Sequence, residues 1–410
     1  MTADWTELGM ADRPSRSARS RVHEMPPFMA EAVQTGRAAV EEPLRGITTD
    51  GVLRDVLSWP LTRDRCSEIT EAGIEVMESL TPDQRGRIRH ALDASEWRLW
   101  FNIHPNVLRH GVMLEDLTVA QRAAALRLLR ATLSDRGYEQ ARNIMRINGF
   151  LAEVTGMRDD FGEWPYFLSI FGDPSEREPW GWQIDGHHLN LNVMVLGDRL
   201  SMTPSLMGSE PCRVEIGPLA GTEVMRDEQR AGLTLMRSLD DKQLEIAVQH
   251  SSLHPADLPA SLNGPIDGRM QAGAFRDNAV IQTEGLRGDA LSDHQRSLLR
   301  GVVGAFVGWS RDDYAEVKMA EVESHLDETW FTWMGVVGDF GPFYYRVQSP
   351  VALAEFDHHA GVVFDNVEPS RHHAHAILRV PNGGDYGADL LRRHHEQYDH
   401  GSGEHVPRSG

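Results

Sequence analysis

Two separated groups of histidines are the residues of this chain best suited to chemistry. His187 and His188 lie in the run from Trp180 to Asn192, and a second group lies in the run from Arg371 to Arg379. Both runs are predicted to be β-strands. Because residues two apart on a strand point to the same face, His373 and His375 should project side by side, as two ligands of one metal ion do.

Carboxylates on a neighbouring segment extend this pattern. Glu355 and Asp357 should share one face of a strand whose other residues, Ala354 and Phe356, are apolar and face the core. Two histidines and a carboxylate suit an open mononuclear metal site. Alternatively, a carboxylate orients a ligand imidazole through its second nitrogen. The simpler interpretation is a solvated cluster, since nine of the 19 histidines follow residue 357.

The first histidine run has one polar and one apolar face when read as a single strand over Trp182–Leu196. His188, Asn190 and Asn192 should share the polar face, while His187 should share the apolar face with leucines and valines. Asparagine is a poor strand former, so this polar face is expected to line a cavity. The alternative is an exposed polar face with His187 as a hydrogen-bonded core residue.

Composition excludes several classes of function. The chain has 41 basic and 61 acidic residues and a net charge of −20, which argues against nucleic-acid binding. Cys66 and Cys212 are far apart and match no zinc or redox spacing, which favours a reduced, cytoplasmic setting. The sequence shows no apolar run typical of a signal peptide or a membrane span, so no membrane partner is expected. Nucleotide-binding and serine-hydrolase motifs are absent as well.

The elements expected around these residues indicate an α+β fold. A helical N-terminal region should pack with a mainly antiparallel sheet that bears inserted helices. Residues 1–45 are predicted to be a loosely ordered arm, residues 46–400 a single domain that is helical to about residue 160 and sheet-rich afterwards, and residues 401–410 a polar tail. Helix starts are expected at Thr81-Pro82 and at the capping box Thr118 to Gln121. Further predicted strands are Tyr166–Phe171, Arg199–Leu206, Thr329–Met334, Phe343–Gln348, Val351–Phe356 and Ala374–Val380.

Taken together, the motifs resemble a bacterial family catalogued as domain of unknown function 3500. The resemblance covers roughly residues 75–400 and implies one α+β domain, but the family name implies no activity. The chain departs from the family around residues 358–372, where His358, His359 and His372 occur. The motifs that carry it are the run Trp180–Asn192, Thr203-Pro204, Gly217-Pro-Leu219, Glu355-x-Asp357, His373-x-His375 with Arg379, and Asp385-Tyr-Gly387.

These residues predict a metal-dependent enzyme that acts on a small molecule, most simply a non-haem oxidoreductase or oxygenase using iron or copper. The expected metal ligands are His373, His375, Glu355 and one of His187 and His188. Gln183, Asn190 and Arg379 are candidates for orienting the substrate. One rival is zinc-type hydrolysis with Asp357 as the base. A rival of another class is a small-ligand-binding protein without catalysis, and an oligomer is compatible with each.

Overall fold

The computed structural model describes residues 27–62, 66–103, 107–158, 161–264, 267–338, 340–361, 363–364, 366–399 and 406–407. Of the arm expected over residues 1–45, residues 1–26 lie outside these ranges, and helix α1 (Pro27–Glu41) occupies part of the remainder. The tail expected over 401–410 also lies outside them, apart from the short strand β15 (Val406–Pro407).

The N-terminal part of the domain is helical, and its helices begin where the sequence predicts. Thr81 caps α3 and Thr118 caps α4, each with the glutamine three residues later completing a capping box. Such caps satisfy backbone N–H groups that have no partner inside the helix. The α-helices that follow α1 are α2 (Ser67–Ser79), α3 (Pro82–Ile88), α4 (Val119–Thr132), α5 (Asp135–Thr155), α6 (Arg226–Arg237), α7 (Asp241–Ala247), α8 (Asp293–Val307), α9 (Asp312–Ser324) and α10 (Ala388–Gln397).

A large, mainly antiparallel sheet organises the described part of the chain. Its strand order is β1-β3-β4-β5-β7-β13-β12-β11-β10-β8, with β2, β6 and β9 paired beside this path. The last of these strands in the sequence, β13, lies between β7 and β12 in the middle of the sheet. The strands are β1 (Arg89–His90), β2 (Val112–Met113), β3 (Tyr166–Phe171), β4 (Trp180–Gly186), β5 (Leu189–Leu196), β6 (Arg199–Ser201), β7 (Ser205–Ser209), β8 (Val248–His250), β9 (Leu286–Arg287), β10 (Trp330–Gly335), β11 (Phe343–Gln348), β12 (Leu353–His358) and β13 (Ala374–Arg379), while β14 (Tyr398–Asp399) pairs with β15 apart from this sheet.

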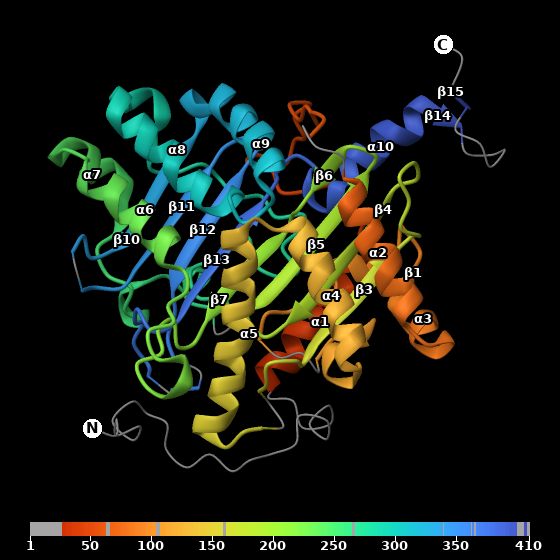
Figure 1. Ribbon diagram of the computed structural model, residues 1–410. Helices are drawn as coiled ribbons and strands as arrows, with labels where there is room; N and C mark the ends of the chain where they lie inside the picture. The colour runs from red at the N-terminus through yellow and green to blue at the C-terminus, as the bar shows by residue number, and fades with distance from the viewer. Residues whose placement is uncertain are drawn as a thin grey trace.

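One face of the sheet carries the main apolar core. Trp182, Leu191, Phe356 and Ala376 point from this face into a cluster that also contains buried residues of the helices. Figure 1 shows α2, α4, α5, α6 and α8 lying across it. Each large side chain buried here contributes about 1.5–3 kcal/mol. The fold is therefore α+β, as the sequence predicts.

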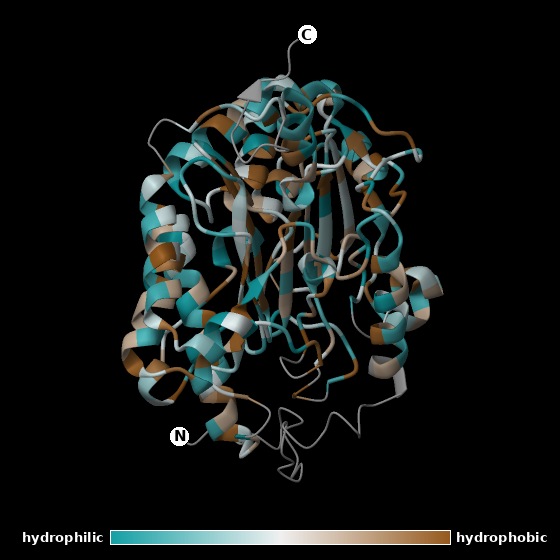
Figure 2. Cartoon of the chain, turned by 90° about the vertical axis from the view of Figure 1, so that its right-hand side faces the viewer, coloured by the Kyte–Doolittle hydropathy of each residue, from teal (hydrophilic) through white to brown (hydrophobic). Residues whose placement is uncertain are grey.

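The opposite face of the sheet is rich in polar residues although it is also buried. Asn190, Glu355, Asp357 and Arg379 are each fully covered. The chain that covers them includes α1, the segment around Trp97–Phe101 and the segment around Met270–Phe275, which share an apolar cluster with the sheet. Figure 2 shows hydrophilic residues on strands at the centre of the molecule. Buried polar groups need partners, so this face is where a functional site is expected.

The structure corrects one prediction about the histidine strands. Trp182–Leu196 is not one strand, because the chain reverses at His187 and His188 between β4 and β5. Gly186 and Leu189 pair across this two-residue turn. His188 has a φ of 63°, in the left-handed region that single turn residues adopt. The polar and apolar alternation continues on both sides of the turn, which is why the pattern resembled one long strand.

Candidate metal centre

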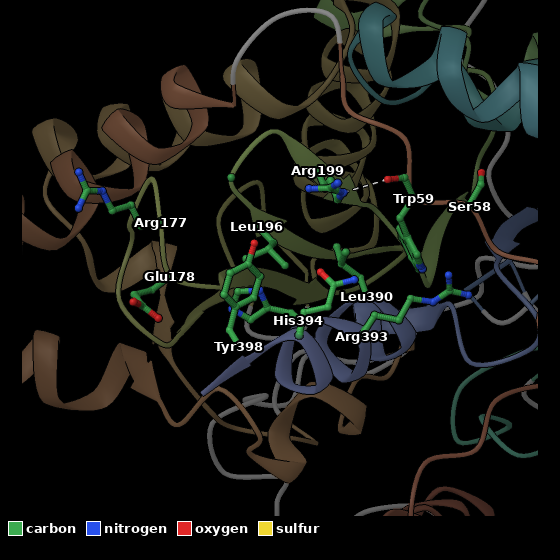
Figure 3. A pocket seen from close by; sticks show the side chains of 12 residues that line it. Ser58, Trp59, Arg177, Glu178, Leu196, Arg199, Leu390, Arg393, His394 and Tyr398 are labelled. Atoms are coloured by element: carbon green, nitrogen blue, oxygen red, sulfur yellow. Dashed lines mark hydrogen bonds between the residues drawn. The ribbon is translucent and has the colours of Figure 1, made fainter. Parts of the chain in front are cut away.

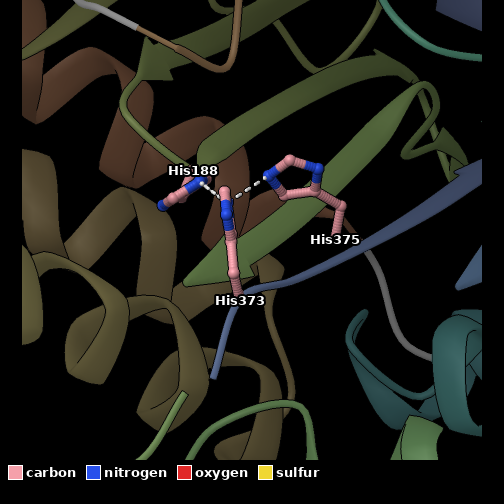
Figure 4. Close-up of side chains that lie close together, drawn as sticks. All are labelled: His188, His373 and His375. Atoms are coloured by element: carbon pink, nitrogen blue, oxygen red, sulfur yellow. Dashed lines mark hydrogen bonds between the residues drawn. The ribbon is translucent and has the colours of Figure 1, made fainter. Parts of the chain in front are cut away.

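Three histidines converge at one end of the polar face and are called the histidine triad here: His188, His373 and His375. His188 comes from the β4–β5 turn, His373 directly precedes β13, and His375 lies on it. The Nε2 atom of His373 lies 3.1 Å from that of His188 and 3.0 Å from that of His375. All three side chains are buried, and Figure 4 shows their rings pointing toward one another.

These distances fit three ligands of one metal ion. Each residue of the triad has one ring nitrogen that lies within 4.8 Å of a ring nitrogen of each of the other two. Two nitrogens bound to one ion at about 2.1 Å and roughly at right angles lie about 3.0 Å apart. The observed separations therefore need little rearrangement to bind an ion.

The hydrogen-bond partner of the His373 ring shows which of its two nitrogens carries the proton. Its Nδ1 atom lies 2.7 Å from the carbonyl oxygen of Ala360, which only accepts hydrogen bonds, so Nδ1 donates. In the neutral ring, Nε2 then carries a bare lone pair. One lone pair accepts one good hydrogen bond, yet two imidazole nitrogens lie within 3.1 Å of it. In addition, Nδ1 of His375 has no hydrogen-bond partner among the described residues. Hydrogen bonds within the triad therefore leave ring nitrogens without partners, whereas a metal ion would bind one nitrogen of each ring.

The electrostatics favour the protonation state that binds metals. Burial lowers the pKa of His373 to about 4. Burial, and then repulsion from neighbouring histidines, lowers the pKa values of His188 and His375 well below the ordinary value. All three rings are thus neutral near pH 7, which is the form that coordinates a metal.

Gly208 on β7 makes room for the triad. It pairs with His375 across the sheet. A Cβ atom at this position would lie 2.7 Å from Cδ2 of His375, 2.8 Å from the carbonyl oxygen of Ala374 and 3.2 Å from Cδ2 of His188. Only glycine leaves that space open. This role could not be predicted from the sequence, because glycine in a strand indicates a close approach but does not identify the neighbouring residue.

His187, the other histidine of the turn, has a different environment. Its Nδ1 atom lies 2.8 Å from Oδ1 of Asn148 on α5. Its ring stacks on that of His188, with centroids 4.0 Å apart. His187 therefore lies beside the triad and supports the ring of His188 rather than joining the group.

A fourth histidine, His359, lies next to the triad; from the sequence it was named only as one of the histidines at which the chain departs from the family. Its ring centroid is 5.0 Å from that of His373 and 5.1 Å from that of His375. Its Nδ1 atom lies 3.5 Å from Oδ2 of Asp357. The preceding residue, His358, instead points to the apolar face, where its Nδ1 accepts a hydrogen bond from the backbone of Phe343.

Asp357 belongs to a buried ion pair at the edge of the triad. Nε and Nη2 of Arg269 donate to its two oxygens at 2.7 and 3.0 Å. Burial alone would raise the pKa of Asp357, but the guanidinium of Arg269 outweighs it and holds the pKa below its ordinary value. Asp357 is therefore a carboxylate whose lone pairs are already engaged and which is a weak base.

Glu355 faces the same side as Asp357 but lies apart from the triad. Its carboxyl group accepts hydrogen bonds from Tyr344 Oη at 2.6 Å and from the backbone N–H groups of Gln271 and Ala272. Burial raises its pKa despite the nearby Arg346. These contacts hold the covering segment to the sheet, and they occupy the carboxyl group that was expected to be a ligand.

The expected substrate-orienting residues are only partly free to bind anything. Arg379 is engaged by Asp385 and Asp277 at 2.7 and 2.5 Å. The amide nitrogen of Gln183 donates to Asn192 at 2.6 Å and to the carbonyl of Trp97. Both residues thus stabilise the buried polar face.

Asn190 and a residue missed from the sequence, Asn102, keep unused hydrogen-bonding capacity. Asn190 donates to Asp185 at 2.5 Å, but its Oδ1 atom has no partner among the described residues. The backbone carbonyl of Asn102 accepts from the N–H of His188 at 2.9 Å. Neither polar atom of the Asn102 side chain has a described partner, and the residue is fully buried. Polar atoms of this kind are rare in native proteins and indicate a bound molecule or water.

Comparison with known protein families identifies the family to which the chain belongs. The model of a family described as protein of unknown function (DUF3500) matches residues 62–388. The chain belongs to the DUF3500 family. The matched span contains the whole triad, His359 and Gly208 of this DUF3500 protein. No curated protein and no solved structure matches the chain.

Across the described ranges, none of the helices of the DUF3500 chain combines the length and the apolar character needed to cross a bilayer.

Proposed function

We propose that this DUF3500 protein is a metal-dependent oxidoreductase that acts on a small molecule. His188, His373 and His375 would hold an iron or copper ion. Imidazole ligands suit both metals, and three protein ligands leave coordination positions for a substrate or oxygen. The bound metal would supply the redox chemistry.

One observation supports this proposal more than any other. Two imidazole nitrogens lie 3.0 and 3.1 Å from a third nitrogen whose own hydrogen is directed away, toward Ala360. Ligand histidines commonly donate their second nitrogen to a carbonyl group, which fixes the ring with its lone pair toward the metal. A buried cluster of neutral histidines without a metal would leave such nitrogens unsatisfied.

A second candidate is zinc-type hydrolysis, because a catalytic zinc ion is also held by three histidines in some enzymes. In that reaction the metal lowers the pKa of a bound water, and a nearby base assists. Asp357 is the expected base, but Arg269 engages both of its oxygens and holds its pKa low. This weakens the form of the hydrolytic alternative in which Asp357 is the base.

The remaining polar groups suggest how a substrate would be held. The amide group of Asn102, whose backbone contacts His188, and the Oδ1 atom of Asn190 have no described partners. His359 presents a ring beside His373 and His375, oriented by Asp357. In this proposal the amides orient the substrate, and His359 contacts it or the metal-bound group.

Metal analysis tests the site first. Protein purified without a histidine tag under anaerobic conditions should contain close to one equivalent of iron or copper. His375→Ala should lose most of it, because a ligand on a preformed sheet contributes more to binding than to folding. His372→Ala is the matched control, since His372 is adjacent in sequence but exposed, and it should retain the metal. Absence of stoichiometric metal, or full retention in His375→Ala, would refute the centre.

An activity screen then separates the functions. The protein would be loaded with iron, copper or zinc and assayed on a small-molecule library with and without oxygen. Turnover that requires oxygen and a redox metal supports the oxidoreductase. Oxygen-independent turnover with zinc replaces it by the hydrolase. Ligand binding without turnover in every condition identifies a binding protein.

A further inference from the structure

A second pocket lies far from the histidine triad. It has a volume of about 750 Å³, within the range typical of small-molecule sites, and is bordered by the β5–β6 turn, α10 and the segment around Trp59. Leu196, at the far end of β5 from His188, forms part of its wall. Seven residue steps separate Leu189 from Leu196, so the pocket lies roughly 23 Å along the strand from the triad. The two sites share no residue.

Besides the exposed Arg177, Arg199 is the cation of this pocket that has no counterion among the described residues. Its Nε atom donates to the carbonyl oxygen of Trp59 at 3.0 Å, and the side chain is half-buried. Its two terminal nitrogens have no partner among the described residues. By contrast, Arg393 in the same pocket is paired with Asp55 at 2.6 Å and with Asp389 at 2.8 Å. Because no described side chain neutralises Arg199, its terminal nitrogens are available to pair with an anionic ligand.

The local backbone holds Arg199 in place. Trp59 has a φ of 49°, which bulky residues rarely adopt and which persists only where surrounding contacts fix it. Its indole N–H donates to Asp389 at 2.9 Å. Trp59 is thus held at its backbone and at its indole ring, and its carbonyl group orients the guanidinium group of Arg199.

Flat rings and polar side chains, among them Ser58, Gln397 and the carboxylate Glu178, share the walls of the pocket. Figure 3 shows Trp59, Leu390, His394 and Tyr398 around the space that Arg199 faces. The rings of His394 and Tyr398 pack together with centroids 5.0 Å apart. Such walls fit a planar ring, while a guanidinium fork fits a carboxylate or a phosphate.

We propose that this pocket binds a small aromatic anion whose carboxylate or phosphate pairs with Arg199. The ring of the ligand packs between Trp59 and Tyr398. The net charge of −20 repels anions from the protein as a whole, so recognition depends on this local cation. The site is independent of the proposed metal chemistry.

Calorimetry with simple probes tests this proposal. Benzoate and phenyl phosphate are titrated separately into the full-length protein, with benzyl alcohol as the neutral counterpart. Saturable binding of at least one anion, at least tenfold tighter than that of benzyl alcohol, is expected. Tighter benzoate binding identifies a carboxylate ligand, and tighter phenyl phosphate binding identifies a phosphate ligand.

Variants identify the residue responsible. Arg199→Met should weaken binding of the preferred anion by about tenfold or more, as loss of a charge-assisted hydrogen bond does. Arg199→Lys keeps the positive charge but not the two-pronged guanidinium group, so its affinity for the anion should lie between those of the native protein and Arg199→Met. This variant also tests the proposal if Arg199→Met fails to fold. His375→Ala, at the distant histidine triad, should bind as the native protein does. Equal binding of benzyl alcohol, no saturable binding of either anion, or unchanged affinity in both Arg199 variants would overturn the proposal.

Discussion

The geometry of the candidate metal centre depends on Gly208 having no side chain. It lies on β7 opposite His375, and two triad rings pass over its Cα. A strand residue usually contributes through its side chain. Here the absence of one allows imidazoles from two segments, 185 residues apart, to approach each other.

Replacing Gly208 by alanine should therefore damage the triad. The added Cβ would lie 2.7 Å from a His375 ring carbon and 2.8 Å from a backbone oxygen, so the rings or strands must move apart. We expect metal affinity to fall by about tenfold or more, similar to the loss when groups supporting a metal ligand are changed. The measurement is a competition titration with a chromogenic chelator.

Gly86 on α3 provides the control for this substitution. A Cβ there meets nothing within 4 Å, so Gly86→Ala should leave metal affinity unchanged. It should also stabilise the helix slightly, by roughly 0.4–1 kcal/mol. Native affinity in Gly208→Ala would show that the triad is not as closely packed as described.

At the scale of elements, several strands were predicted closely, whereas Arg199–Leu206 is two strands, β6 and β7, and the turn that carries His188 was missed. Phe343–Gln348 was predicted with the bounds that the structure has, because aromatic and β-branched residues alternate there. The β4–β5 turn was missed because Gly-His-His is not a typical turn sequence, and the two-residue loop does not interrupt the alternation. Sequence therefore could not decide between His187 and His188.

Strand alternation predicted some residues of the candidate site and could not predict others. His373 and His375 were predicted to lie together because their spacing on one strand fixes it. The position of His359 beside the triad and the role of Arg269 could not be predicted, because both depend on how the loops cross the sheet. Glu355 was expected near the metal from strand alternation, which gives the face but not the distance along it.

The β4–β5 hairpin should also carry a pH dependence through Asp185. Burial raises the pKa of this carboxyl group to about 8, although the N–H of Phe101 donates to it. In the unfolded chain it ionises above about pH 4. Unfolding therefore releases a proton between these values, and stability falls as pH rises through this window.

Asp185→Asn should remove this contribution, because asparagine does not titrate and its oxygen can still accept from Phe101. We expect the stability of the variant relative to the native protein to increase by about 1 kcal/mol per pH unit between pH 5 and 7. Urea unfolding at several pH values measures this. A pH-independent difference between the two proteins would mean that Asp185 is ionised in the folded state.

For the whole molecule, metal removal should change stability but not the fold. The triad lies on a sheet that buries an extensive apolar face independently of any ion. A metal present at 100 times its dissociation constant would add about 2.7 kcal/mol. A chelator should thus lower the melting temperature by a few degrees while the far-UV circular dichroism stays unchanged, and added metal should restore it. Loss of the far-UV signal on chelation would indicate that the metal is needed for folding.

The central position of β13 has a consequence for how the protein is made. Both of its neighbours, β7 and β12, come earlier in the sequence, so each has an open edge until residues 374–379 leave the ribosome. Open edges invite pairing with other chains. The same late segment brings two of the three triad histidines. In the proposed centre, metal would bind only after residues 373–375 have been synthesised, and a product that ends before them would lack two of the three ligand histidines.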